Sequence, residues 1–103
     1  MIPYSRQKIF NEDIQEVNKV LKSNYLTQGP FVDRFENSII KYTGAKYATA
    51  VNSATSALHL SCLALGLKKG DTLWTVPNTF VASANCAIHC GAKIDFVDID
   101  END

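Results

Sequence analysis

The sequence predicts an α/β fold in which helices cover a parallel sheet. Three observations support this class. From residue 45 onward, short runs rich in β-branched and aromatic residues alternate with longer runs of helical periodicity. A glycine, Gly66 or Gly91, follows each of the longer runs and suits a left-handed helix end. Two strands that are joined by a helix lie parallel to each other in the sheet, and the connection is a right-handed crossover.

Residues 1–44 are predicted to form a helical segment ahead of the sheet. One helix begins with Asn11 as its cap residue, followed by two acidic residues that favour the positive end of the helix dipole, and it ends near Ser23. A second helix begins at Pro30, since proline suits the first helical position, and ends at Gly44.

Residues 45–103 are predicted to begin an α/β domain. Its elements are expected in the order strand, helix, strand, helix and strand, over residues 46–51, 55–65, 73–76, 80–89 and 93–97. Ligands of such sheets bind at the carboxyl ends of the strands. Here those ends fall at residues 52–55, 77–80 and 98–100.

Charge and composition exclude several classes of partner. The 103 residues carry a net charge of −1 with scattered Lys and Arg, so no basic surface for nucleic acid or for a membrane is expected. The N-terminus lacks the apolar core of a signal peptide, and no apolar run reaches the length of a membrane-spanning helix. We therefore expect a cytoplasmic protein.

The cysteines and histidines are interpreted as structural. Cys62, Cys86 and Cys90 form no Cys-x-x-Cys motif and are expected to be reduced, buried thiols. The spacing of Cys86, His89 and Cys90 could begin a metal site, but zinc takes three or four protein ligands, so no metal is expected. His59 is interpreted as a packing residue or as part of an exposed helix face, rather than as a general base.

The strongest candidate site covers residues 52–60. A predicted strand enters a helix there through small hydroxylated residues, so free backbone N–H groups and hydroxyls could hold a phosphate at the positive end of the helix. The alternative is an ordinary helix cap, because Ser and Thr are favoured at that position without any ligand.

The two other strand ends offer weaker candidates. Phe80 could stack on a flat phosphorylated cofactor, although an aromatic residue at a helix start is often part of the core. Asp98 and Asp100 alternate after the third predicted strand and do not define a set of metal ligands.

An ordered set of short motifs resembles the DegT-type nucleotide-sugar aminotransferases. The set covers nearly the whole chain, and its order and spacing are more specific than any single motif. The blocks are residues 26–30, 35–36, 51–58, Gly66 with 70–71, 77–82, 91–92 and 96–100.

The resemblance implies a pyridoxal-phosphate enzyme of fold type I, whose large cofactor-binding domain begins at residues 45–103. Its cofactor would be pyridoxal 5′-phosphate (PLP), its substrates glutamate and a UDP-linked keto-sugar, and its assembly a homodimer. Ala54 and Thr55 would contact the cofactor phosphate, and Phe80 would stack on the pyridine ring. The residues that would lie near the sugar nucleotide are Tyr4, Thr27, Gln28 and Gly29.

The same resemblance supplies no catalytic residue. The family's Schiff-base lysine, and the acid that protonates the pyridine nitrogen, follow later than the motifs found here, and none of the eight lysines lies at the matching position. We therefore expect an N-terminal fragment that is inactive alone.

Three alternatives remain open, and one of them is a structural remnant without activity. The first is a phosphate- or nucleotide-binding α/β module without catalysis, although both familiar glycine-rich phosphate loops are absent from the sequence. The second is a PLP-dependent sugar dehydratase of the same family, in which a histidine replaces the lysine.

Overall fold

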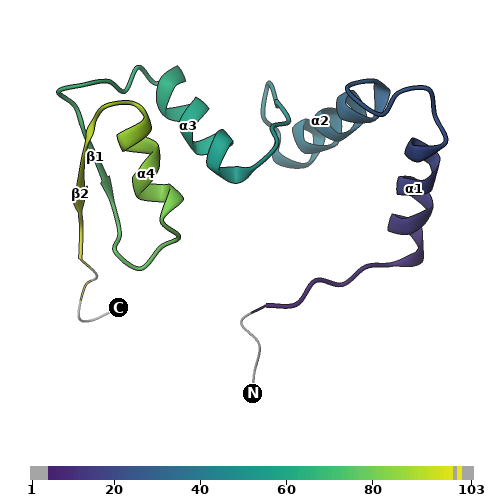
Figure 1. Ribbon diagram of the computed structural model, residues 1–103, viewed down its shortest axis with the longest axis horizontal. Coiled ribbons are helices and arrows are strands. Elements are labelled where there is room, and N and C mark those ends of the chain that lie inside the picture. The colour runs from purple at the N-terminus through teal and green to yellow at the C-terminus, as the bar shows by residue number, and fades with distance from the viewer. Residues whose placement is uncertain (1–4, 99, 101–103) are drawn as a thin grey trace. The chain divides into compact units, whose positions relative to one another are not determined.

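The computed structural model describes residues 5–98 and 100, which form two compact units (Figure 1). The first unit extends to Ala50 and the second begins at Val51. Helix α1 (Asn11–Leu21) and helix α2 (Pro30–Thr43) belong to the first unit. The second unit contains α3 (Ala54–Ala64), β1 (Thr72–Thr75), α4 (Ala82–His89) and β2 (Lys93–Phe96).

Both helices of the first unit begin where the sequence predicts. The cap of α1 differs in one detail, because the N-cap residue is Phe10 and its amide donates to Oδ2 of Asp13 at 2.8 Å. Thus a carboxylate of the first turn, rather than Asn11, satisfies the amide that precedes the helix. Helix α2 starts at Pro30 and ends at Gly44, whose φ of 72° is the left-handed conformation that glycine adopts without strain.

The predicted strand over residues 46–51 is not formed. These residues follow α2 and form neither a helix nor a paired strand. The Ala50 amide donates to Oε1 of Glu36 at 2.7 Å. A strand exists only where a neighbouring strand accepts and donates its backbone hydrogen bonds. Within the described residues the sheet contains β1 and β2 alone, so the β-favouring sequence has no strand to pair with. A side chain of α2 fixes the end of this segment instead.

The second unit confirms the predicted parallel α/β arrangement. Strands β1 and β2 pair in parallel, with Leu73 opposite Ile94, and α4 connects them. Helix α4 packs on both strands, and α3 packs on α4. The sheet therefore has α4 on one face, as Figure 1 shows.

Helices α3 and α4 end in the same way. Each is followed by a glycine of positive φ, Gly66 or Gly91, and the next residue donates its amide back across the last turn. The Leu67 amide donates to the Cys62 carbonyl at 3.0 Å, and the Ala92 amide to the Ala87 carbonyl at 2.9 Å. These are Schellman motifs, which satisfy carbonyl groups that a helix otherwise leaves free at its end.

The buried core of the second unit consists of small side chains. The buried apolar residues among those described are Cys62, Ala82, Ala84, Cys86 and Ala87. Because these side chains are small, α4 can approach both α3 and the sheet closely. The prediction of buried, reduced cysteines is confirmed for Cys62 and Cys86, while Cys90 is half-buried and also unpaired.

No helix in the described part of the chain is both long enough and apolar enough to cross a membrane.

Candidate functional site

The first turn of α3 lies at the candidate phosphate site. Ser53 is the N-cap residue, with extended backbone, and its Oγ accepts the Ser56 amide at 3.1 Å. The hydroxyl of Ser56 in turn donates to Oδ1 of Asn52 at 2.6 Å. The ordinary capping interaction is therefore present, and it uses the two serines rather than Thr55.

The cap leaves donors available at the start of the helix. Ser53 satisfies the amide of the third helical residue, whereas Ala54 and Thr55 occupy the first two positions, whose N–H groups have no partner within an α-helix. Both residues are exposed. The first turn of α3 carries no acidic residue, whereas α1 has Glu12 and Asp13 there and α2 has Asp33. An anion at this end of α3 would meet backbone donors, a hydroxyl and the positive end of the helix dipole without a competing carboxylate.

Phe80 lies between β1 and α4, beyond the carboxyl end of β1. Its side chain is 76% exposed, so within this unit it is not a core residue. The hydroxyls of Thr79 and Ser83, one on each side of Phe80 in the sequence, lie 3.1 Å apart and hold the start of α4 to the segment that carries Phe80. The exposed ring is free to cover a ligand.

The turn at Thr27, Gln28 and Gly29 belongs to the first unit and has a constrained backbone. Gln28 adopts a φ of 53°, which is uncommon for a residue with a side chain, and Gly29 has a φ of 104°. A Cβ on Gly29 would lie 2.9 Å from Cβ of Tyr25, so only glycine fits there. Tyr4, which was assigned to the same region from the sequence, lies outside the described residues.

Two interactions that involve α3 were not predicted from the sequence. One is the Asn52–Ser56 hydrogen bond, which the spacing of four residues across the helix start could have indicated. The other pairs His59 of α3 with His89 of α4, whose ring centres lie 5.3 Å apart. The second contact joins different helices, so no local pattern could have predicted it.

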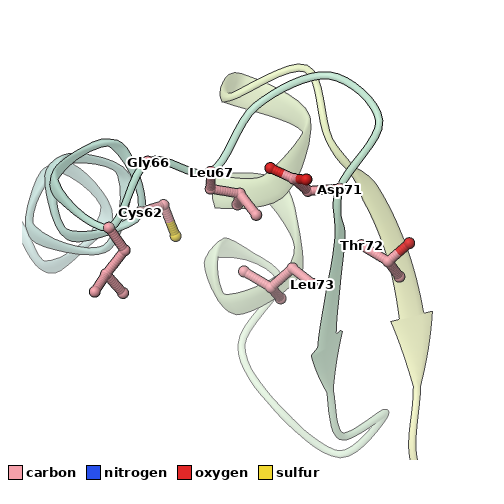
Figure 2. A pocket seen from close by; sticks show the side chains of 7 residues that line it. Cys62, Gly66, Leu67, Asp71, Thr72 and Leu73 are labelled. Atoms are coloured by element: carbon pink, nitrogen blue, oxygen red, sulfur yellow. The ribbon is translucent and has the colours of Figure 1, made fainter.

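A cavity of about 270 Å³ lies elsewhere in the second unit, between the end of α3 and the start of β1 (Figure 2). Leu67 and Leu73 contribute to its mainly apolar lining, and Cys62 and Asp71 also line it. It contains none of the residues predicted to bind cofactor or substrate. Burial raises the pKa of the Cys62 thiol, and the nearby thiols of Cys86 and Cys90 raise it further. Cys62 is therefore an unreactive thiol at neutral pH.

Groups of three or more His, Cys, Asp or Glu side chains that could hold a metal ion are absent from the residues that the structure describes.

Relatives of known sequence and structure match almost all of this chain. UDP-4-amino-4,6-dideoxy-N-acetyl-beta-L-altrosamine transaminase of Campylobacter jejuni is 50% identical over 99 residues, which are 96% of this chain and 26% of that protein. Spr1654 of Streptococcus pneumoniae, solved in its PLP form, superposes with a TM-score of 0.92 at 33% identity, over 99% of this chain and 26% of the other. Helicobacter pylori PseC, an aminotransferase involved in the biosynthesis of pseudoaminic acid, superposes with a TM-score of 0.88 at 35% identity, over 95% and 27% of the two chains.

These relatives confirm the fold-type I interpretation of the α/β fold, and the chain spans about a quarter of their length. Residues 7–103 match a single family throughout. The two helices of the first unit and the parallel strands of the second both lie inside this match, as does the exposed start of α3. The chain therefore belongs to the DegT/DnrJ/EryC1/StrS aminotransferase family.

Proposed function

We propose that this chain forms part of a PLP-dependent aminotransferase that moves an amino group from glutamate to a UDP-linked keto-sugar. Family membership and the 50% identical transaminase support this reaction class. The structural observation that carries the proposal is the first turn of α3. The amides of two exposed residues and a threonine hydroxyl lie there, at the positive end of the helix, without an acidic residue.

The residues of the second unit fit the cofactor. In this proposal the amides of Ala54 and Thr55, with the Thr55 hydroxyl, bind the phosphate of PLP, and Ser53 keeps the helix start in the required conformation. The exposed ring of Phe80 covers one face of the pyridine and excludes water from it. When bound, PLP supplies the electron-withdrawing ring that delocalises negative charge during amino transfer.

The residues of the first unit are proposed to contact the sugar nucleotide. The rigid backbone at Gln28 and Gly29 supports this role, because a turn that is already ordered loses little entropy when a ligand binds. Tyr4 and Thr27 are assigned to the same function by resemblance. We also propose that residues 1–44 are a helical segment and that residues 45–103 begin the cofactor-binding domain.

Substitution of Thr55 tests the cofactor site. In the full-length polypeptide, Thr55→Val should weaken PLP binding by about 1–3 kcal/mol, since the phosphate loses a hydrogen bond and a polar group is left without its partner. The measurement is a fluorescence titration of the apoenzyme with PLP.

Two controls make that result specific. Thr55→Ser retains the hydroxyl and should keep most of the affinity. Thr72→Val makes the same chemical change at an exposed residue of β1 and should leave the affinity unchanged. Unchanged PLP affinity in Thr55→Val would contradict the phosphate role.

The chain of 103 residues is proposed to lack the reactive lysine. Mixing the purified chain with PLP and then with borohydride should leave every lysine without a specific adduct, as measured by peptide mass spectrometry. One lysine labelled stoichiometrically would overturn this assignment. In the longer polypeptide, a lysine at the family position would favour the aminotransferase, and a histidine there would favour the dehydratase.

We further propose, on resemblance, that the active enzyme is a cytoplasmic homodimer. Sedimentation velocity of the full-length polypeptide distinguishes a dimer from a monomer.

A further inference from the structure

The His59 and His89 rings form a pair that bridges two helices. His59 lies on α3 and His89 on α4, and their ring centres are 5.3 Å apart with the ring planes tilted by 47°. His59 is half-buried and His89 is exposed, so the pair lies at the solvent-facing edge of the α3–α4 contact. Both helices belong to the second unit.

This spacing matches two imidazoles that share a tetrahedral ion. A zinc–nitrogen bond of about 2.0–2.1 Å places the ion roughly 3.2 Å from each ring centre, so a tetrahedral angle separates the two centres by about 5.2 Å. The observed separation is 5.3 Å. The tilt of 47° matches neither parallel stacked rings nor a perpendicular edge-to-face pair.

We propose that His59 and His89 bind a divalent ion of the zinc class and thereby join α3 to α4. Neutral imidazole is a preferred ligand of Zn²⁺, Ni²⁺ and Cu²⁺. Two protein ligands are provided, and no third His, Cys, Asp or Glu completes a group within the described residues, so water fills the remaining positions. The site is therefore weaker than a structural zinc site with four protein ligands.

The neighbouring thiols are the competing ligands. Cys62 follows His59 by three residues on α3, and Cys86 precedes His89 by three residues on α4. Both are buried, and the Cys86 Sγ already donates to the Ser83 carbonyl at 3.3 Å. A thiol binds zinc as the thiolate, and for Cys62 burial raises the pKa and so disfavours that form. Cys90 is less buried and is the thiol most able to compete.

An ion held in this way would stabilise the helix pair. A ligand that binds the folded state and not the unfolded state raises the free energy of unfolding by linkage. His59 lies in the middle of α3 and the candidate phosphate site lies at its start, so the ion would fix the orientation of that helix without contacting the cofactor.

Calorimetric titration of ZnCl₂ into the full-length polypeptide, after treatment with a chelator, tests the proposal. The expected result is one ion per chain and a melting temperature that rises with zinc concentration. His59→Gln and His89→Gln should each weaken binding at least tenfold and abolish the rise. Cys90→Ala, the matched control, should bind zinc as the wild type does.

Each other outcome overturns the proposal. Absence of binding up to millimolar zinc, or wild-type affinity in His89→Gln, would exclude the pair as ligands. Loss of binding in Cys90→Ala would assign the ion to the thiols. His89 is exposed, so its substitution is not expected to unfold the protein, and equal melting temperatures of the metal-free wild type and His89→Gln verify this.

Discussion

At the scale of single residues, the backbone at Gln28 and Gly29 is the most constrained feature of the first unit. Gly29 combines a φ of 104° with a ψ of −178°, a region that is essentially restricted to glycine. The adjacent Tyr25 closes off the space that a Cβ would occupy. The sequence predicted that these residues form an irregular segment between two helices, but it could not predict the close approach of Tyr25, which depends on the path of the chain between them.

Gly29→Ala should therefore lower the free energy of unfolding of the full-length polypeptide by about 2–3 kcal/mol, because strain and a steric clash act together. Gly44→Ala provides the control. Gly44 also has a positive φ, 72°, but a Cβ there meets nothing within 4 Å, so its cost should be nearer about 1 kcal/mol. Denaturant unfolding measures both values. Equal losses for the two variants would show that the contact with Tyr25 contributes nothing.

At the scale of elements, the sequence predicted the helices more reliably than the strands. Local signals define a helix, such as Pro30 at the start of α2 and the glycines that end α3 and α4, and all of them act at the predicted places. A strand depends on a partner that is distant in the sequence. Residues 72–75 and 93–96 pair with each other, whereas residues 46–51 have the composition of a strand without a partner among the described residues.

The start of α3 shows the same division for the candidate site. The sequence predicted that this helix starts at residue 55, one residue after its observed start at Ala54. The roles of those two residues, and of Phe80, remain predictions. Which serine caps the helix, and how Asn52 supports it, depended on side-chain geometry that residue types do not determine.

Ser53→Ala tests the contribution of that cap to α3. Loss of the Ser53 hydroxyl leaves the Ser56 amide without its acceptor, so the free energy of unfolding should fall by about 1 kcal/mol. Ser61→Ala is the matched control, because Ser61 lies exposed within the same helix, where alanine is at least as favourable as serine. The midpoints of urea unfolding of the full-length polypeptide compare the two variants. A larger loss in Ser61→Ala than in Ser53→Ala would contradict the capping role.

At the scale of the whole molecule, the described residues bury few large side chains. The buried apolar residues are alanines and cysteines, whereas Trp74 is 63% exposed and Leu65 is 87% exposed. Composition alone could not reveal this, because 46% hydrophobic residues is typical of a globular domain. The family match explains the pattern in part, since relatives of this chain are about four times as long and have more chain with which to cover such surfaces.

The chain of 103 residues, taken by itself, should therefore unfold without a sharp transition. A cooperative transition requires a core whose loss exposes much apolar surface at once, and here most of the large apolar side chains are already exposed. Differential scanning calorimetry should show a broad, weak heat-absorption signal, and the chain should bind a hydrophobic dye at room temperature. A single sharp peak would show that the small core suffices.

The paired Schellman motifs after α3 and α4 have a consequence for sequence variation. Each motif turns the chain with main-chain groups and one glycine, so the direction in which the polypeptide leaves each helix does not depend on which side chains face the neighbouring helix. Homologous proteins could therefore gain or lose the imidazoles of His59 and His89, between α3 and α4, by single substitutions while the path of the chain stays the same. Metal affinity in this part of the fold would then be a trait that changes independently of the architecture.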